Sequence, residues 1–119
     1  MKYLLLIYEN EAAFAGLPEG EQGKVFEEYM DYTRRIKKDG NYVSGEALQP
    51  ISTATTVRVK NGKTVTTDGP FAETREQLGG FYMVEARDLD EAIKLAAAIP
   101  ASRTGSIEVR PIMPTPPVD

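Results

Sequence analysis

The chain has 119 residues and a formal net charge of -4, and it contains neither cysteine nor histidine. This length suits one domain with its own core, and the negative charge argues against general affinity for nucleic acid. The two missing residue types exclude disulfides, cysteine nucleophiles, histidine bases and nearly all zinc, copper or haem ligation. Any chemistry would use Asp, Glu, Tyr, Ser, Thr, Lys or Arg, and we expect no cofactor and no metal.

The first predicted element is a strand over residues 3–8, a continuous apolar run typical of burial on both faces. The run is too short to span a membrane and lacks the features of a signal peptide, so we expect a soluble, cytoplasmic protein. Residues 18–39 then change to a helical period. The apolar stripe of this predicted helix comprises Val25, Phe26, Tyr29, Met30, Thr33 and Ile36. The basic run at residues 34–38 lies at the helix end, where the helix dipole favours cations.

A second main strand is predicted over residues 42–48. Two further β-branched runs, residues 55–59 and 64–67, flank Asn61 and Gly62. An Asn-Gly pair between such runs is the strongest local signal for a β-hairpin. We therefore predict a hairpin inserted after the second main strand.

The third main strand is predicted at residues 81–84, which are apolar on both faces. A second helix should begin at Asp88, because Glu91 three positions later completes a capping-box spacing. Pro100 should end this segment. Residues 106–110 alternate apolar and charged side chains, which indicates a last strand that is covered on one face.

The predicted fold class is α+β, of the ferredoxin-like βαββαβ kind with an inserted β-hairpin. Residues 1–112 form the domain, and residues 113–119 form a Pro-rich, extended C-terminal tail. In this topology the first and third main strands are central and both helices cover one face of the sheet. The other face would expose apolar side chains, so we expect a homodimer in which two sheets meet face to face.

Residues 67–82 fit neither the helical nor the strand period. Their core, Asp68-Gly69-Pro70-Phe71-Ala72-Glu73-Thr74, closely resembles the signature of the DGPF proteins, a branch of the YCII-related family. Residues 2–8, 45–59 and 105–111 also resemble that family, so that the resemblance spans about 110 residues of the chain. It implies a dimeric α/β barrel, in agreement with the architecture expected from the strand and helix patterns.

The resemblance implies little about activity, because the DGPF branch is largely uncharacterised. Its members are often encoded beside extracytoplasmic-function sigma factors, which implies a functional link to such a factor. The broader family includes proteins with a proposed His–Asp catalytic pair, and some relatives are lyases that act on chlorinated aromatics. Asp39 could match that aspartate, but the chain contains no histidine, so the mechanism does not carry over.

Asp68 has two interpretations. In the first it caps a tight turn, its carboxylate accepting the amide of Phe71, with Thr74 and Gln77 spaced as a second capping box. In the second it is a carboxylate beside a cleft, where Phe71 and neighbouring charges adjust its pKa. Glu73 has the same two interpretations, as a member of a surface ion network or as a site residue.

Tyr8, Tyr82, Glu108 and Arg110 are further candidates, because strands of this fold can project side chains into a cleft. The alternatives are the core or dimer interface for the tyrosines and a solvated strand face for the charged pair. Residues 79–80, both glycine, are interpreted as a bulge or a close backbone approach rather than a phosphate loop.

Two functions from different classes remain open. The first is a module that binds a small molecule in a cleft, with Tyr8, Asp68, Phe71, Glu73, Tyr82 and Arg110 as ligand-binding candidates. The second is a lyase or isomerase that uses the Asp68 and Glu73 carboxylates for acid–base catalysis. We favour the binding module because histidine is missing. Direct binding to nucleic acid or to a membrane is not expected.

Overall fold

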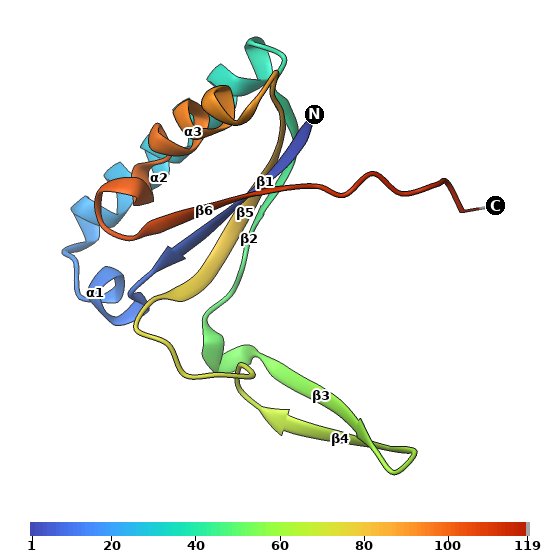
Figure 1. Cartoon of the computed structure of the whole chain (residues 1–119). Coiled ribbons are helices and arrows are strands. Elements are labelled where there is room, and N and C mark those ends of the chain that lie inside the picture. Colours follow the sequence, from blue (N-terminus) through green and yellow to red (C-terminus); the bar gives the residue numbers. More distant parts are fainter. Residues whose placement is uncertain (119) are drawn as a thin grey trace.

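The computed structural model describes residues 1–118, which form three α-helices, two short 3-10 helices and six strands in two antiparallel sheets (Figure 1). In chain order the elements are β1 (Lys2–Glu9), α1 (Glu11–Ala15), α2 (Glu19–Lys38), β2 (Tyr42–Ala47), a 3-10 helix (Ile51–Thr53), β3 (Thr55–Lys60), β4 (Lys63–Asp68), β5 (Gln77–Glu85), α3 (Leu89–Ala97), a 3-10 helix (Pro100–Arg103) and β6 (Ser106–Pro111). Among residues 1–118 no helix combines the length and apolar composition that crossing a bilayer requires.

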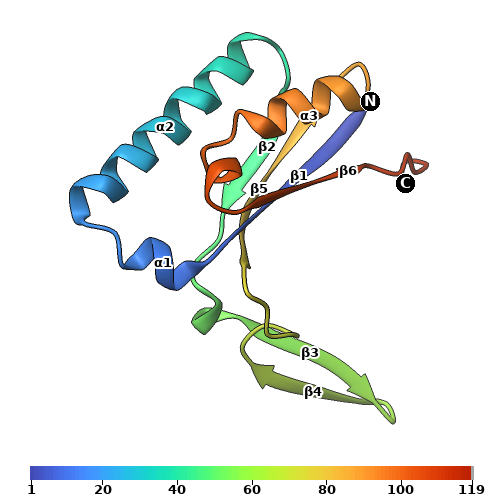
Figure 2. The same cartoon turned by 60° about the vertical axis from the view of Figure 1, so that its left-hand side comes forward.

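The main sheet has the strand order β2-β5-β1-β6, and every neighbouring pair is antiparallel. The two central strands, β1 and β5, are those that the sequence shows as apolar on both faces. Helices α2 and α3 lie together on one side of this sheet (Figures 1 and 2). The predicted α+β class is confirmed, and the strand order is compatible with a ferredoxin-like fold.

The core lies between the sheet and the two long helices. Strand side chains alternate between two faces, so Tyr3, Leu5 and Ile7 of β1 all point toward the helices and are buried. They form one cluster with residues of the other elements, namely Tyr32, Ile36, Tyr82, Val84, Ala86, Ala92, Ala96, Ile99 and Ala101. This cluster supplies most of the apolar burial that stabilises the domain.

The opposite side of the main sheet, here called the open face, has no helix over it (Figure 2). Its centre is formed by Leu4 and Leu6 of β1, paired with Met83 and Phe81 of β5, and all four side chains are half-buried. On the other flank of β1, Leu4 pairs with Arg110 and Leu6 pairs with Glu108. The open face is therefore an apolar centre with charged residues on the last strand beside it.

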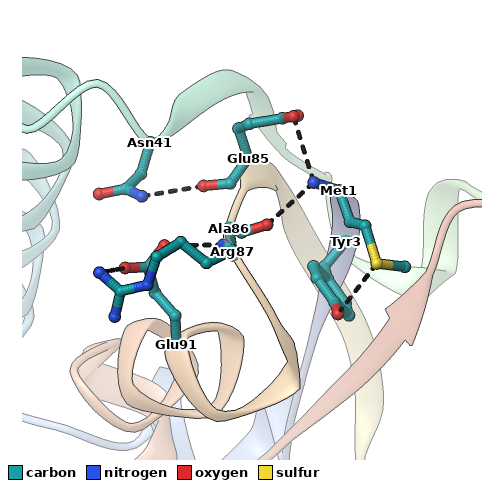
Figure 3. A network of polar contacts seen from close by, with 7 residues as sticks. All are labelled: Met1, Tyr3, Asn41, Glu85, Ala86, Arg87 and Glu91. Carbon is teal, nitrogen blue, oxygen red and sulfur yellow. Dashed lines mark hydrogen bonds and ion pairs between the residues drawn. The ribbon is translucent and has the colours of Figure 1, made fainter.

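Polar contacts join segments that are distant in sequence at the end of the sheet where β1 begins and β5 ends (Figure 3). The Met1 nitrogen donates to the Ala86 carbonyl (2.9 Å), and the Asn41 side chain donates to the Glu85 carbonyl (2.8 Å). Asp88 caps α3 by accepting the Glu91 amide (2.9 Å), as predicted. These bonds satisfy backbone groups at the strand and helix ends that would otherwise be unpaired.

Three local features differ from the sequence prediction. The short helix α1 was not predicted, and it begins where the Asn10 side chain accepts the Ala13 amide (2.8 Å). The proposed capping box of Thr74 and Gln77 is wrong, because β5 begins at Gln77, whose side chain donates to the Thr74 carbonyl (2.7 Å). The third main strand is therefore longer than residues 81–84.

The predicted bulge and close approach at residues 79–80 are both present. The register of β1 against β5 shifts between Ile7 and Tyr8, which leaves Gly79 without an opposite residue. A methyl group on Gly80 would lie only 2.8 Å from the Glu46 carbonyl oxygen, so β2 can pair this closely only with glycine there.

Strands β3 and β4 form a two-stranded sheet of their own, which we call the arm (residues 55–68). Asn61 and Gly62 both have positive φ at its tip, in agreement with the predicted hairpin turn. The arm projects away from the main sheet (Figures 1 and 2). As a result the radius of gyration is 16.5 Å, against about 13–14 Å expected for a compact domain of this length.

Candidate functional site

The structure distributes the predicted ligand-binding residues over three places. Tyr82 points to the helix side of the sheet, and Tyr8 and Arg110 lie on the open face. The remaining three, Asp68, Phe71 and Glu73, are exposed at the base of the arm. A single chain therefore does not gather the six residues into one pocket.

The carboxylates at the base of the arm have few contacts. Within residues 1–118, neither Asp68 nor Glu73 accepts a hydrogen bond through its side chain or forms an ion pair. The expected bond from the Phe71 amide to Asp68 is absent there, and Phe71 itself is 81% exposed. Glu76, by contrast, accepts the Ser106 hydroxyl (2.8 Å) and so ties this segment to β6.

On the open face, the guanidinium of Arg110 pairs with the carboxylate of Glu108. Both residues alternate with Ile107 and Val109, which face the helices and pack against the core. The charged pair thus occupies the uncovered side of β6, as its alternation predicted.

A groove of about 350 Å³ lies along α2 on the helix side of the sheet and is lined by Phe26, Tyr29, Met30, Thr33 and Arg34. The sheet and α3 cover only part of the apolar stripe of α2. Tyr32 and Ile36 are buried, whereas Phe26 and Met30 remain 60% and 54% exposed. On the helix-facing side of the sheet, β2 and β5 pair Gly45 with Tyr82 and Ala47 with Gly80.

Thr33, which lines the groove, connects it to Tyr82, which does not line it and is only 8% exposed. Thr33 Oγ1 donates to the Tyr29 carbonyl (2.8 Å) and lies 2.7 Å from the Tyr82 hydroxyl. Because threonine has one hydroxyl proton, Tyr82 must be the donor in the second bond. The Tyr82 oxygen therefore keeps its lone pairs for another partner.

The phenols beside the groove stay protonated at neutral pH. Burial raises the pKa of Tyr29, Tyr32 and Tyr82 above the ordinary tyrosine value. Tyr32 uses its proton to donate to the Leu95 carbonyl (2.8 Å), which links α2 to α3. The groove therefore offers neutral hydroxyls rather than phenolates.

Arg34 supplies the one charge among the groove-lining residues. Its guanidinium pairs with Asp31 (2.8 Å), and both side chains are largely exposed. An exposed pair of this kind is weak, so the guanidinium can exchange Asp31 for another anion at little cost. No group of three or more acidic side chains within residues 1–118 comes close enough together to hold a metal ion.

None of the five groove residues was proposed as a site residue from the sequence, because Phe26, Tyr29, Met30 and Thr33 fit an ordinary core stripe. The sequence feature that could have indicated the groove was the width of this apolar stripe, together with the polar Thr33 within it. Arg34 was assigned to the basic helix end. Tyr82, which forms a hydrogen bond with Thr33, was proposed as a ligand-binding residue from the sequence.

The fold and the groove define a small α+β domain with one helical layer and a partly apolar surface site. The sequence profile of the YCII-related domain matches residues 1–116. The protein R00369 of Rhizobium meliloti (strain 1021), described as uncharacterized, is 36% identical over 114 residues, covering 94% of this chain and 92% of that protein. The chain therefore belongs to the YCII-related family.

Proposed function

We propose that the protein binds a small, mostly apolar molecule with one anionic group in the groove beside α2. The observation that carries the proposal is the groove itself, in which exposed Phe26 and Met30 lie beside the Thr33 hydroxyl, which is held by Tyr82. It is a shallow, open depression of about 350 Å³ with mostly apolar walls and one cation, so it would cover one side of a ligand rather than enclose it.

The lining residues suggest how such a ligand would lie. Phe26, Tyr29 and Met30 would contact its apolar body, and thioether and aromatic groups adapt well to ring-shaped ligands. Tyr82 would hold the Thr33 hydroxyl in place at the groove wall. Arg34 would leave Asp31 and pair with the anionic group.

The proposal includes a homodimer of the dimeric α/β barrel type, located in the cytoplasm, and membership of the DGPF branch on the basis of residues 68–74. The support for the dimer is the open face, where Leu4, Leu6, Phe81 and Met83 lie without a helical cover. Two such faces would bury one another around a two-fold axis. A link to a sigma factor stays a prediction from the family resemblance.

The alternative, an acid–base lyase or isomerase, also stays a prediction. Its two proposed carboxylates, Asp68 and Glu73, lie at the base of the arm rather than at the groove. The groove-lining residues favour binding, because they present neutral hydroxyls and a cation but no carboxylate.

Binding can be tested with 1-anilinonaphthalene-8-sulfonate, an apolar ring system with one anionic group. We expect a saturable rise in its fluorescence with one site per chain. Met30→Glu should weaken this binding roughly tenfold or more, because it places a carboxylate on the apolar wall. The matched control is Ile93→Glu on α3, since Ile93 is 49% exposed but does not line the groove. Equal effects of the two variants would refute the groove as the site.

The dimer is tested separately by sedimentation equilibrium of the same samples. We expect the wild type to be dimeric at micromolar concentration. Leu6→Asp should make it monomeric, because the new carboxylate would lie opposite Glu108 in the apolar centre of the open face. A monomeric wild type would rule out the dimer.

A further inference from the structure

The arm is the part of the molecule with the least burial. Its two strands pair only with each other, and among its valines Val57, Val59 and Val65 are 60%, 67% and 41% exposed. An isolated two-stranded hairpin is marginally stable in water, and it normally needs a third strand or another layer. The arm has neither within the described part of its own chain.

The two faces of the arm differ in chemistry. The strand register pairs Val57 with Thr66 and Val59 with Thr64. Near the tip of the arm, one face is therefore formed by uncharged β-branched side chains. The other face carries Arg58 opposite Val65 and Lys60 opposite Lys63. We call the first the valine face and the second the basic face.

The signature segment forms a rigid elbow at the base of the arm. Gly69 has φ +97°, a conformation that other residues adopt only with strain. Its amide donates to the Ala54 carbonyl (2.7 Å), and its carbonyl accepts the Thr56 hydroxyl (2.8 Å). Pro70, which follows, fixes its own φ, so the chain leaves β4 in one direction.

The segment that carries the arm is anchored to the start of α1 on both sides of the arm. The Glu11 carboxylate accepts the Ile51 amide (3.1 Å), and the Glu11 amide donates to the Gln77 side chain (3.0 Å). Asn10 adds a longer contact to the Arg75 carbonyl (3.4 Å). Both ends of the inserted segment are therefore fixed to one point of the domain, which sets the exit of the arm.

The arm extends to the side of the sheet that faces away from α2 and α3, where the open face lies (Figures 1 and 2). It also carries a charge of the opposite sign from the rest of the chain. Three cations and one acid give residues 55–68 a net charge of +2, so with a total of -4 the remaining residues carry -6. This charge difference favours the approach of a second copy of this chain to the arm as a whole, while the cations lie on the basic face and the valine face supplies the uncharged contact surface.

We infer that the arm is a dimerisation arm whose valine face packs on the second copy of the chain, and that residues 68–74 are the elbow that aims it. The inference rests on the homodimer proposed above and adds to it. The arm of each protomer continues the interface of the open face over the partner's surface. The signature segment then acts in assembly rather than in catalysis.

The test compares the dimer dissociation constants of full-length variants by sedimentation equilibrium. Val57→Thr combined with Val59→Thr keeps β-branched residues in the hairpin but removes apolar surface, and should raise the dissociation constant roughly tenfold or more. The matched control is Val65→Thr on the basic face, for which we expect less than about a threefold change.

A shortened arm gives a second, larger perturbation. Deleting residues 57–60 and 63–66 leaves Thr56 and Thr67, an existing cross-strand pair, joined by Asn61 and Gly62. The elbow bonds to Gly69 remain possible, so the domain should keep its circular dichroism spectrum while its dimer weakens further.

The outcomes separate the two proposals. A monomeric wild type would overturn the dimer and the arm together. A dimeric wild type whose dissociation constant is the same in the shortened and double-valine variants would overturn the arm alone and leave the open-face dimer standing. Equal weakening by Val65→Thr and by the double-valine variant would overturn the assignment of the valine face.

Discussion

The main sheet and the arm are both antiparallel β structure from one chain, yet they differ in how far other elements bury their side chains. In β1, Leu5 is completely buried between its neighbouring strands and the helices, whereas Val59 of β3 is 67% exposed. Strong local turn chemistry at Asn61 and Gly62 is enough to define a hairpin. It does not supply the third strand or packed element that a two-stranded hairpin needs for stability, and that must come from another part of the structure or from another chain.

The difference predicts where a single chain derives its stability. Removing a buried side chain should be costly in the main sheet, because a cavity remains. Removing an exposed side chain from the arm should leave the free energy of unfolding of a monomer nearly unchanged. The comparison can therefore be tested by matched substitutions in the two regions.

The largest expected effect is that of Leu5→Ala. We expect a loss of about 3 kcal/mol in the free energy of unfolding, measured by urea denaturation, because Leu5 is fully buried in the core cluster. Val59→Ala, measured under conditions where the chain is monomeric, should cost less than about 0.5 kcal/mol. A comparable loss in both variants would mean that the arm is packed against its own domain.

An intermediate effect is expected from Gly45→Ala. A methyl group there would lie 2.8 Å from the Tyr82 ring, so the ring must move and its bond to Thr33 is disturbed. We expect a loss of about 1–3 kcal/mol in unfolding free energy together with weaker dye binding in the groove. The control is Gly79→Ala at the bulge, where no atom lies within 4 Å of the added methyl group. Normal dye binding by a folded Gly45→Ala would contradict the role of Tyr82.

The smallest expected effect appears only at alkaline pH. Because burial raises the pKa of Tyr29, Tyr32 and Tyr82, the unfolded chain loses phenolic protons at a lower pH than the folded one. The unfolding free energy should therefore fall as pH rises past about 10. Urea titrations at about pH 9 and about pH 11 should show this fall, and Tyr32→Phe should reduce it. An unchanged pH response in Tyr32→Phe would mean that Tyr32 does not contribute to this fall.

Much of the fold could be predicted from local patterns. Continuous apolar runs identified β1 and β5 as central strands, Asn61 and Gly62 located the hairpin, and Asp88 located the start of α3. Each of these depends on interactions within a few residues, which the sequence shows directly. The order of the elements then limited the topology to very few choices.

The groove could not be predicted in the same way. All five of its lining residues belong to α2, and how far the other elements cover this helix is decided by tertiary packing. Phe26 and Met30 show the periodicity of core residues whether or not the sheet covers them. The short helix α1 was missed because its five residues carry too little periodicity.

The strand order also bears on how the protein is made. The central strand β1 is synthesised before both of its partners, β5 and β6, which begin after residue 76. Until they emerge, the run Leu4-Leu5-Leu6-Ile7 has no native neighbour and resembles an aggregation-prone segment. We expect this run to need protection by chaperones until β5 and β6 have emerged, and folding to be slow for a domain of this size because its decisive contacts join segments far apart in the sequence.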